Sequence, residues 1–484
     1  MDTAFLGQAY TSRSPMLASQ TAINIYPELV ETSGSDIGGF NGSPGLLSKF
    51  QGSGEVRGLW VTGTGIPGQY YLFAVIGPNV YRIDKNYSGT LLGMLPNNSG
   101  RVSMADNGTQ LSIYHQAGMH WVALTGTAIA AIDGAPQGGT MSALDNYVVF
   151  SENIGGEFGI SALGDVSSLD PLDVATAEGW PDDCVGVLAD HREVWLFGTE
   201  TIEVWSDTGA AFFPFERVPG GFIEQGCAAK FSPAKLDNSI FWVGRDRNGK
   251  GIIYRANAYI PIRISTHAIE FAINKGDISD AIGFAYQSEG HLFYQVSFPS
   301  LDQTWVYDVS TGPQGAWHQK AWKDTSGLLH RHRANCQAFF YNDHLVGDYQ
   351  NGNISHMSQN YFDDNGAEIY RERAWELPSD KEGNGRTRID SVELIALSGD
   401  SGTFNSDGTN SNDMPLVWMQ ISKDAGQIWS YERFKRLGPL GIRKARARWR
   451  RGGSGRNLVL RVGTTMKQRV SWVGALVTGE VLKV

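Results

Sequence analysis

The apolar positions of this chain mostly follow the two-residue period of β-strands. No segment longer than about a dozen residues places apolar side chains at i, i+3, i+4 and i+7 between helix caps. Instead, strands rich in aromatic and β-branched residues alternate with turns rich in Gly, Asn or Asp. The clearest of these hairpin segments are residues 70–84, 194–207, 240–256, 291–318, 339–357 and 416–434. The pattern predicts an all-β protein assembled from hairpins.

The hairpin segments recur at irregular intervals of about 40 to 65 residues, a spacing typical of a β-propeller with four-stranded blades. One blade cannot bury both of its faces, whereas a closed ring of blades covers the faces and protects the strand edges. About six such blades fit between residue 55 and the C-terminus. A pair of β-sandwiches is the alternative architecture, because it also combines short strands with closely spaced turns.

The remaining sequence divides into an arm and loops. Residues 1–54 hold turn residues and isolated apolar positions with little alternation, so we expect an extended N-terminal arm that wraps along the protein. Residues 55–484 are expected to form the propeller body, ending in a basic strand region at 431–484. Two polar segments, 378–388 and 398–414, are expected to be inserted loops.

Composition excludes several classes of protein. The 59 glycines have no three-residue period, which excludes collagen, and 41% hydrophobic residues are too many for a disordered chain. No apolar run approaches the ~18 residues that a membrane-spanning helix needs. The N-terminal residues lack the charged start and apolar core of a secretory signal. Cys184, Cys227 and Cys336 are far apart, which predicts buried free thiols in a reducing compartment.

The net charge of −10 conceals a basic C-terminal region. Residues 431–484 hold 14 Lys and Arg but two acidic residues, a net charge of +12, so the rest of the chain carries −22. Within this region Arg446, Arg448 and Arg450 alternate with Ala447 and Trp449. Because alternate residues of a strand share a face, this order predicts a strand with an arginine face and an Ala/Trp face.

A stripe of arginines attracts polyanions such as DNA. The candidate DNA-binding residues are Arg443, Lys444, Arg446, Arg448, Arg450, Arg451 and Arg456. Two other interpretations remain open, because charge patterns do not identify partners. The stripe could face solvent and the acidic remainder of the protein, or it could face an acidic surface of a partner subunit.

Residues 422–429, SKDAGQIW, match the Asp-box pattern S-x-D-x-G-x-x-W. In such a turn the hydroxyl of Ser422 and the carboxylate of Asp424 bind turn amides, Gly426 permits the bend and Trp429 packs beneath it. The motif is structural, although it occurs in propellers of sialidases and other glycosidases. A propeller glycosidase or glycan-binding module is therefore the alternative function. Arg263 is a candidate for the arginine cluster of such a site, but spacing does not supply the rest.

The sequence predicts no enzyme activity, no cofactor and no metal site. His115 with His120, and His330 with His332, lack the third and fourth ligands that a metal site needs. No Walker P-loop, G-x-S-x-G elbow or HExxH motif is present. Two pairs of adjacent carboxylates are expected to be loop acids, namely Asp182–Asp183 and Asp363–Asp364.

An ordered set of segments carries a family resemblance. The set begins with SRSPMLASQTAINIYPELVE (12–31), GGFNGSPGL (38–46), EVRGLWV (55–61) and YLFAVIGPNVYRID (71–84). It ends with SKDAGQIW, RARWRR and LVLRVGTTMKQRVSWVGA. Together these segments resemble the packaged-DNA-stabilising tail proteins of short-tailed bacteriophages, also called tail nozzle or tail hub proteins. The resemblance extends over about the whole chain.

The resemblance implies a virion tail protein with a propeller body, assembled in the host cytoplasm. Proteins of this kind form a homo-hexameric ring below the head-to-tail adaptor ring, extend the DNA exit channel and retain the packaged double-stranded DNA until ejection. They also offer surfaces to tail fibre, tailspike or needle proteins. No enzyme activity follows from the resemblance. An acidic body would let DNA slide through a channel, while a local arginine stripe could hold phosphates.

Overall fold

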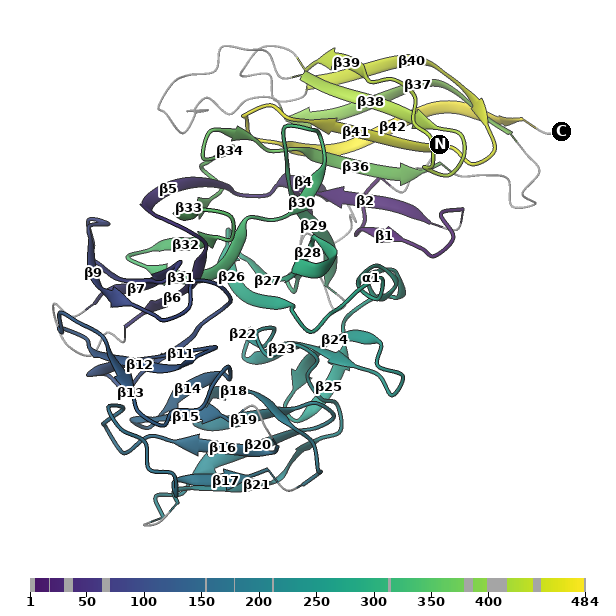
Figure 1. The fold of residues 1–484 in the computed structure, drawn as a ribbon. Helices are drawn as coiled ribbons and strands as arrows, with labels where there is room; N and C mark the ends of the chain where they lie inside the picture. Colours follow the sequence, from purple (N-terminus) through teal and green to yellow (C-terminus); the bar gives the residue numbers. More distant parts are fainter. Residues whose placement is uncertain are drawn as a thin grey trace.

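The computed structural model consists of a ring of β-sheets with a second, smaller β-body stacked against it (Figure 1). The structure describes residues 5–16, 18–29, 38–62, 70–152, 155–177, 179–210, 213–311, 315–377, 386–397, 416–437 and 445–482. Within these ranges the only α-helix is α1 (His267–Ile273), whose N-cap Thr266 accepts a hydrogen bond from the Ile269 amide. No helix in the described part of the chain is long and apolar enough to cross a membrane.

The ring is a β-propeller, which confirms the fold predicted from the sequence. In blades 1 to 6 the four strands follow one another in chain order. Blades 1 to 3 are β6 (Val56–Val61), β7 (Leu72–Ile76), β8 (Asn79–Ile83), β9 (Gly89–Met94); β10 (Ser103–Asp106), β11 (Gln110–His115), β12 (Gly118–Ala123), β13 (Ala130–Ile132); and β14 (Met141–Leu144), β15 (Tyr147–Ser151), β16 (Glu157–Ile160), β17 (Val174–Thr176).

Blades 4 to 6 repeat this plan. Their strands are β18 (Cys184–Asp190), β19 (Glu193–Gly198), β20 (Ile202–Asp207), β21 (Phe215–Ile223); β22 (Ala234–Leu236), β23 (Ser239–Arg245), β24 (Gly251–Asn257), β25 (Ile260–Arg263); and β26 (Ile282–Ser288), β27 (His291–Phe298), β28 (Gln303–Asp308), β29 (Ala316–Lys323). The 3-10 turn η1 (Pro299–Leu301) precedes β28, and β30 (Leu329–Arg331) pairs with the end of β29.

The last blade closes the ring with a strand from the start of the chain. It consists of β31 (Ala334–Phe340), β32 (Asp343–Asp348), β33 (Gly352–Ser358) and β5 (Gly45–Gly52). The described residues thus form seven blades, against about six expected. The short strands of blades 2 and 3 lack long aromatic runs, segment 416–434 lies outside the ring, and β5 lies in the expected arm.

Two-residue turns with positive φ angles join the first two strands in five of the blades. In blade 4, for example, His191 and Arg192 have φ of 48° and 65°, and in blade 7 Tyr341 and Asn342 have 45° and 68°. Consecutive positive φ angles define the type I′ turn, whose twist matches that of paired strands. These turns repeat around the ring even where the turn sequence contains no Gly.

The smaller body is a β-sandwich of two antiparallel sheets built from both ends of the chain. One sheet has the order β2 (Ser19–Ile23), β36 (Arg371–Glu376), β41 (Val459–Thr464), β38 (Leu416–Ser422) and β39 (Arg433–Arg436). The other has the order β3 (Ile25–Glu28), β4 (Gly39–Gly42), β42 (Ser471–Leu482), β37 (Arg386–Leu397) and β40 (Ala445–Gly455). The short strand β1 (Tyr10–Thr11) pairs with β2, whereas β34 (Asp363–Asp364) and β35 (Ala367–Glu368) extend the sheet of blade 7 beside β5.

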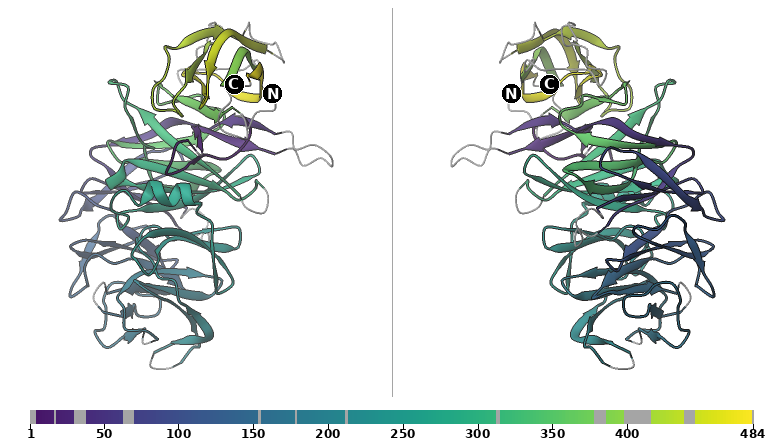
Figure 2. Two further views of the ribbon diagram at one scale, coloured as in Figure 1. Left: turned by 90° about the vertical axis from the view of Figure 1, so that its right-hand side faces the viewer. Right: turned by 90° about the vertical axis from the view of Figure 1, so that its left-hand side faces the viewer.

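The N-terminal arm lies between the two bodies, as both side views show (Figure 2). Strand β2 pairs on one side with β29 of blade 6 and on the other with β36 of the sandwich. The sequence had placed residues 1–54 in one unit and residues 55–484 in another. In the structure the arm supplies strands to both bodies, and the chain from Arg371 onward builds the sandwich.

A separate apolar cluster fills the space between each pair of neighbouring blades. The cluster between blades 5 and 6 continues into the sandwich, where it includes Trp375, Trp449 and Trp472, each at most 1% exposed. Phe5 of the arm packs edge-on against Trp375 at 4.9 Å between ring centroids. Burial of large side chains stabilises a fold by roughly 1.5–3 kcal/mol each, so this shared core couples propeller and sandwich.

Candidate functional site

The arginine stripe lies on β40, an edge strand of the sandwich. Arg446, Arg448 and Arg450 are exposed, whereas Ala447 and Trp449 are each 1% exposed and face the core. The alternation predicted from the sequence is therefore present. The indole of Trp449 donates a hydrogen bond to the Arg433 carbonyl at 2.6 Å, which fixes β40 beside β39.

One carboxylate partly balances the stripe. Glu393 of β37 lies opposite Arg448 in the sheet; its oxygens are 3.1 Å from Arg448 Nε and 3.4 Å from Arg446 Nη1. Ion pairs this exposed contribute at most about 1 kcal/mol. Among the described residues no carboxylate lies within ion-pair distance of Arg450, so the stripe keeps a net positive charge.

Strand β39 adds cations that the sequence analysis did not single out. Lys435 and Arg436 are exposed, and the Arg433 guanidinium donates to the Arg450 carbonyl. We call Arg433, Lys435, Arg436, Arg446, Arg448 and Arg450 the basic edge. Their shared location follows from contact between β39 and β40, the edge strands of two different sheets, which the sequence pattern does not reveal.

The other candidate DNA-binding residues lie apart from the centre of the basic edge or outside the described residues. Arg451 is exposed in the left-handed region, with φ 61°, next to a bulge in β37. Arg456 is exposed in the turn that follows β40. Arg443 and Lys444 fall outside the described part of the chain.

The Asp-box segment forms a turn in the sandwich, after β38. Ser422 Oγ donates to Asp424 Oδ1 at 2.6 Å and accepts from the Gly426 amide at 2.8 Å. The same carboxylate oxygen accepts two further turn amides, at 3.1 and 2.9 Å. Trp429 is half-buried under the Arg461 guanidinium, 4.1 Å from its ring centre. The turn is structural, and it lies outside the propeller.

The described lining of the propeller axis lacks the carboxylates and the tyrosine of a sialidase-like site. The residues that line the cavity on the axis include no Asp, Glu or Tyr in the described part of the chain. Arg263 lies on β25, the outer strand of blade 5, and its Nε donates to Glu270 at 2.6 Å. The carboxylates and the tyrosine of a sialidase site are therefore missing from the described lining of the axis cavity, although Arg101 lies there.

The histidine pairs form local contacts. His115 Nε2 and His120 Nδ1 are 2.9 Å apart, and burial lowers the pKa of His115 to about 4. His330 is bonded to Asp302 at 2.6 Å, while His332 is buried with a pKa well below the usual value. No group of three or more potential ligands could hold a metal ion among the residues that the structure describes.

The three cysteines are buried free thiols, as the sequence predicts. Burial raises the pKa of Cys184 to about 12 and that of Cys227 to about 11. A thiol of this kind stays protonated and unreactive at neutral pH. These residues serve packing between blades.

Asp363 and Asp364 differ from the loop acids expected, because both are buried where blade 7 meets the sandwich. Burial raises the pKa of Asp364 to about 7, against the opposing effect of the nearby Arg371. Burial also lowers the pKa of Lys320 to about 7; its Nζ donates to the Tyr286 hydroxyl at 2.6 Å. This polar cluster joins the two bodies.

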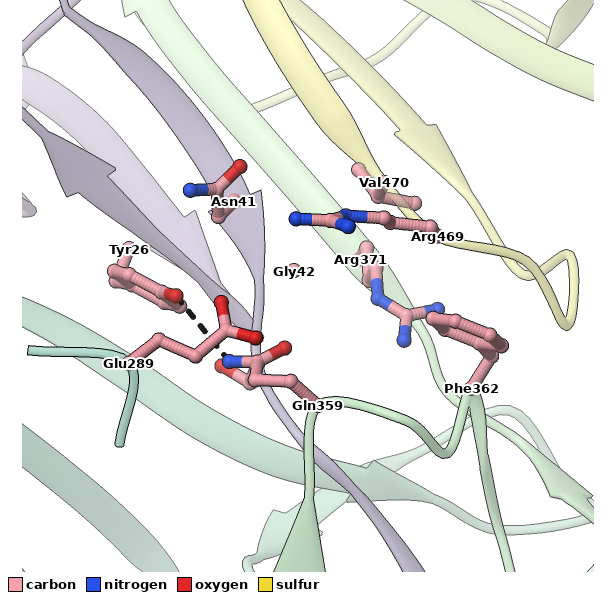
Figure 3. Close-up of a pocket in the computed structure, with 10 residues that line it drawn as sticks. Tyr26, Asn41, Gly42, Glu289, Gln359, Phe362, Arg371, Arg469 and Val470 are labelled. Atoms are coloured by element: carbon pink, nitrogen blue, oxygen red, sulfur yellow. Dashed lines mark hydrogen bonds between the residues drawn. The ribbon is translucent and has the colours of Figure 1, made fainter. Parts of the chain in front are cut away.

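A small cavity lies beside this cluster, at the joint between the propeller and the sandwich (Figure 3). Arg371 and Arg469 point into it from the sandwich, Glu289 reaches it from the turn between β26 and β27, and Gln359 donates to the Tyr26 hydroxyl at 3.2 Å. Its volume of ≈ 10 Å³ holds about one water molecule. The cavity leaves no room for a substrate.

Comparisons with known proteins match the division into two bodies. Residues 4–361 match the family model described as "Bacteriophage P22 Gp10, beta-propeller", and residues 374–480 match that described as "Bacteriophage P22 Gp10, beta-sandwich". A search of curated proteins gives no match.

Two solved structures are similar in outline. The WD40 propeller domain of Doa1 aligns at TM-score 0.39 and 11% identity over 66% of this chain and 97% of that one. The extracellular domain of a hybrid two-component system from B. thetaiotaomicron aligns at 0.43 and 9% over 75% of this chain and 44% of that one. Both TM-scores are below 0.5.

Proposed function

The chain belongs to the bacteriophage P22 Gp10 family and is a structural component of a phage tail; from this premise we propose that it is a nozzle subunit that extends the DNA exit channel. In this proposal six copies form a ring below the head-to-tail adaptor. The ring retains packaged DNA until ejection and carries tail fibre, tailspike or needle proteins. The match of both bodies to the family is the observation that carries the proposal.

The architecture supports a mechanical role. A ring of blades closed by β5 and fused to the sandwich through one continuous core resists deformation. The cavity at the joint is too small for a substrate, and no Asp, Glu or Tyr lines the axis cavity among the described residues. These features favour a structural protein over the glycosidase alternative.

We assign the DNA contact to the basic edge. Alternate residues of a strand are ~6.6–6.8 Å apart, so the three exposed guanidinium groups of Arg446, Arg448 and Arg450 can each contact a different phosphate of a duplex. Each phosphate contact that is formed changes the slope of log K against log[salt] by about −0.9.

The assembly is tested by electron microscopy of the purified protein, alone and mixed with adaptor rings. Rings with a central hole, docked on the adaptor, are the expected result. Isolated monomers that do not bind the adaptor ring would contradict the proposed nozzle role.

The DNA contact is tested separately by duplex binding at several salt concentrations. Replacing Arg446, Arg448 and Arg450 by Gln should make the salt slope shallower by about 2 to 3. The matched control replaces three exposed cations at the tip of the β23–β24 hairpin by Gln, namely Arg245, Arg247 and Lys250. Equal effects of the two triple variants would overturn the assignment, because net charge alone would then explain binding.

A further inference from the structure

A cavity of ≈ 370 Å³ runs along the propeller axis and receives residues from the first strand of every blade: β6, β10, β14, β18, β22, β26 and β31. Ligand pockets typically measure ≈ 300–1,000 Å³, so it can hold a nucleotide-sized molecule but not a DNA duplex. Leu59, Met104, Val187 and Phe284 give the wall an apolar part.

The charge of this cavity has one sign, although the chain as a whole carries −10. Its charged lining residues are Arg101, Lys230 and Lys235, and no acidic side chain or His lines it among the described residues. Lys235 is partly balanced, since its Nζ lies 3.0 Å from the Ala189 carbonyl and 4.0 Å from Asp190 Oδ1. Arg101 and Lys230 have no carboxylate within ion-pair distance in the described part of the chain.

Arg101 and Lys230 meet at one aromatic ring, although they precede the first strands of blades 2 and 5. Arg101 Cζ lies 5.6 Å and Lys230 Nζ 5.7 Å from the ring centre of Phe231. The main chain of Phe231 is fixed because its carbonyl accepts the Gly283 amide at 2.8 Å. Both cations therefore lie within 5.7 Å of the centre of one ring that lines the same end of the cavity.

Both cations retain unused capacity to donate hydrogen bonds. Arg101 Nη1 donates to the Arg57 carbonyl at 2.9 Å, but the buried Arg101 Nε has no hydrogen-bond partner among the described residues. Lys230 Nζ donates to one backbone carbonyl, that of Gly138, of the three bonds an ammonium can make. Burial lowers the pKa of Lys230, as expected for a desolvated cation without a counter-charge.

We propose that this end of the axis cavity binds the phosphate group of a small phosphomonoester. The guanidinium and ammonium groups would hold the phosphate oxygens, and the apolar wall would contact the body of the ligand. The anion would supply the counter-charge that these cations lack. The site is independent of the nozzle role and of the basic edge.

The test uses the full chain with three probes: adenosine monophosphate, inorganic phosphate and adenosine. Calorimetric titration should show binding of the monophosphate, weaker binding of inorganic phosphate, and none of adenosine. Lys230→Gln and Arg101→Gln should each weaken binding of the monophosphate about tenfold or more, since each removes a charge-assisted hydrogen bond. Lys250→Gln, at an exposed hairpin tip, should leave binding unchanged.

The melting temperature of each variant without ligand reports whether it folds. If Arg101→Gln does not fold, Lys230→Gln decides the matter. Absence of binding of both adenosine monophosphate and inorganic phosphate at millimolar probe concentration would overturn the proposal. So would equal binding by the wild type and Lys230→Gln, or binding of adenosine as tight as that of its monophosphate.

Discussion

Replacement of Asn24 by Ala should destabilise the contact between the propeller and the sandwich. The loss of stability should exceed that of any substitution of similar size on the surface. Asn24 is 2% exposed and lies between β2 and β3. Its Nδ2 donates to the Ala321 carbonyl of blade 6 and to the Tyr370 carbonyl before β36, both at 2.7 Å. Its Oδ1 accepts the Ala321 amide at 3.0 Å.

The expected loss of folding free energy follows from these three hydrogen bonds. Truncation to Ala leaves three buried backbone groups without their partners, at about 1–2 kcal/mol each, or about 3–6 kcal/mol together. The residue has φ 51°, a conformation that Asn tolerates and that costs Ala about 1–2 kcal/mol more. The sum is a large part of the ~5–15 kcal/mol that stabilises a typical domain.

Two measurements check this expectation. Urea unfolding gives the loss of global stability, and hydrogen exchange of peptides covering β2 and β29 gives the local free energy of opening. The matched control is Asn342→Ala, an exposed turn residue with φ 68°, which carries the backbone cost alone. Equal losses in the two variants would refute the reasoning, because the buried hydrogen bonds of Asn24 would then contribute nothing.

Two further changes probe the joint and the ring closure. Because the pKa of Asp364 is about 7 in the fold, its neutral form contributes stability that is complete below about pH 4 and is lost as the pH rises through 7. Asp364→Asn should therefore flatten the fall of the melting temperature between pH 4 and 7, and parallel curves for the two proteins would contradict this. A Cβ added at Gly352 would lie 2.2 Å from the Gly52 carbonyl oxygen, so Gly352→Ala should cost about 1–3 kcal/mol and expose β5 to hydrogen exchange. Gly474→Ala, which meets no atom within 4 Å, should cost nothing; equal melting temperatures for both Gly variants would exclude a tight closure.

The propeller was predictable because each blade is a local unit with its own strand pattern and turns. Its boundaries were not, because they depend on pairings distant in sequence. Strand β5 lies beside β33 about 300 residues later, a partnership that ring closure selects and no local pattern encodes. The sandwich was not predictable from the sequence for a related reason. Its strands alternate apolar and polar residues like those of a blade, so the pattern of segment 416–434 does not distinguish it from a blade hairpin.

The arginine face of β40 was predictable because alternation on one strand is local. The contribution of Lys435 and Arg436 was not, since it depends on how the edges of two sheets meet. The shared position of Arg101 and Lys230 beside Phe231 was not predictable from the sequence either. These residues come from loops before two blades that face each other only in the closed ring.

The position of the arm sets the order in which this protein can mature on the ribosome. Residues 19–28 emerge early, yet β2 finds its partners at 319 and 372–374, and β5 finds its own at 352–358. Translation must therefore pass residue 376 before the arm can be enclosed, and the final strand β42 is needed to complete the second sheet of the sandwich. Until then the early strand edges stay open to neighbouring nascent chains, so a slow stretch of synthesis before the sandwich would favour aggregation over folding.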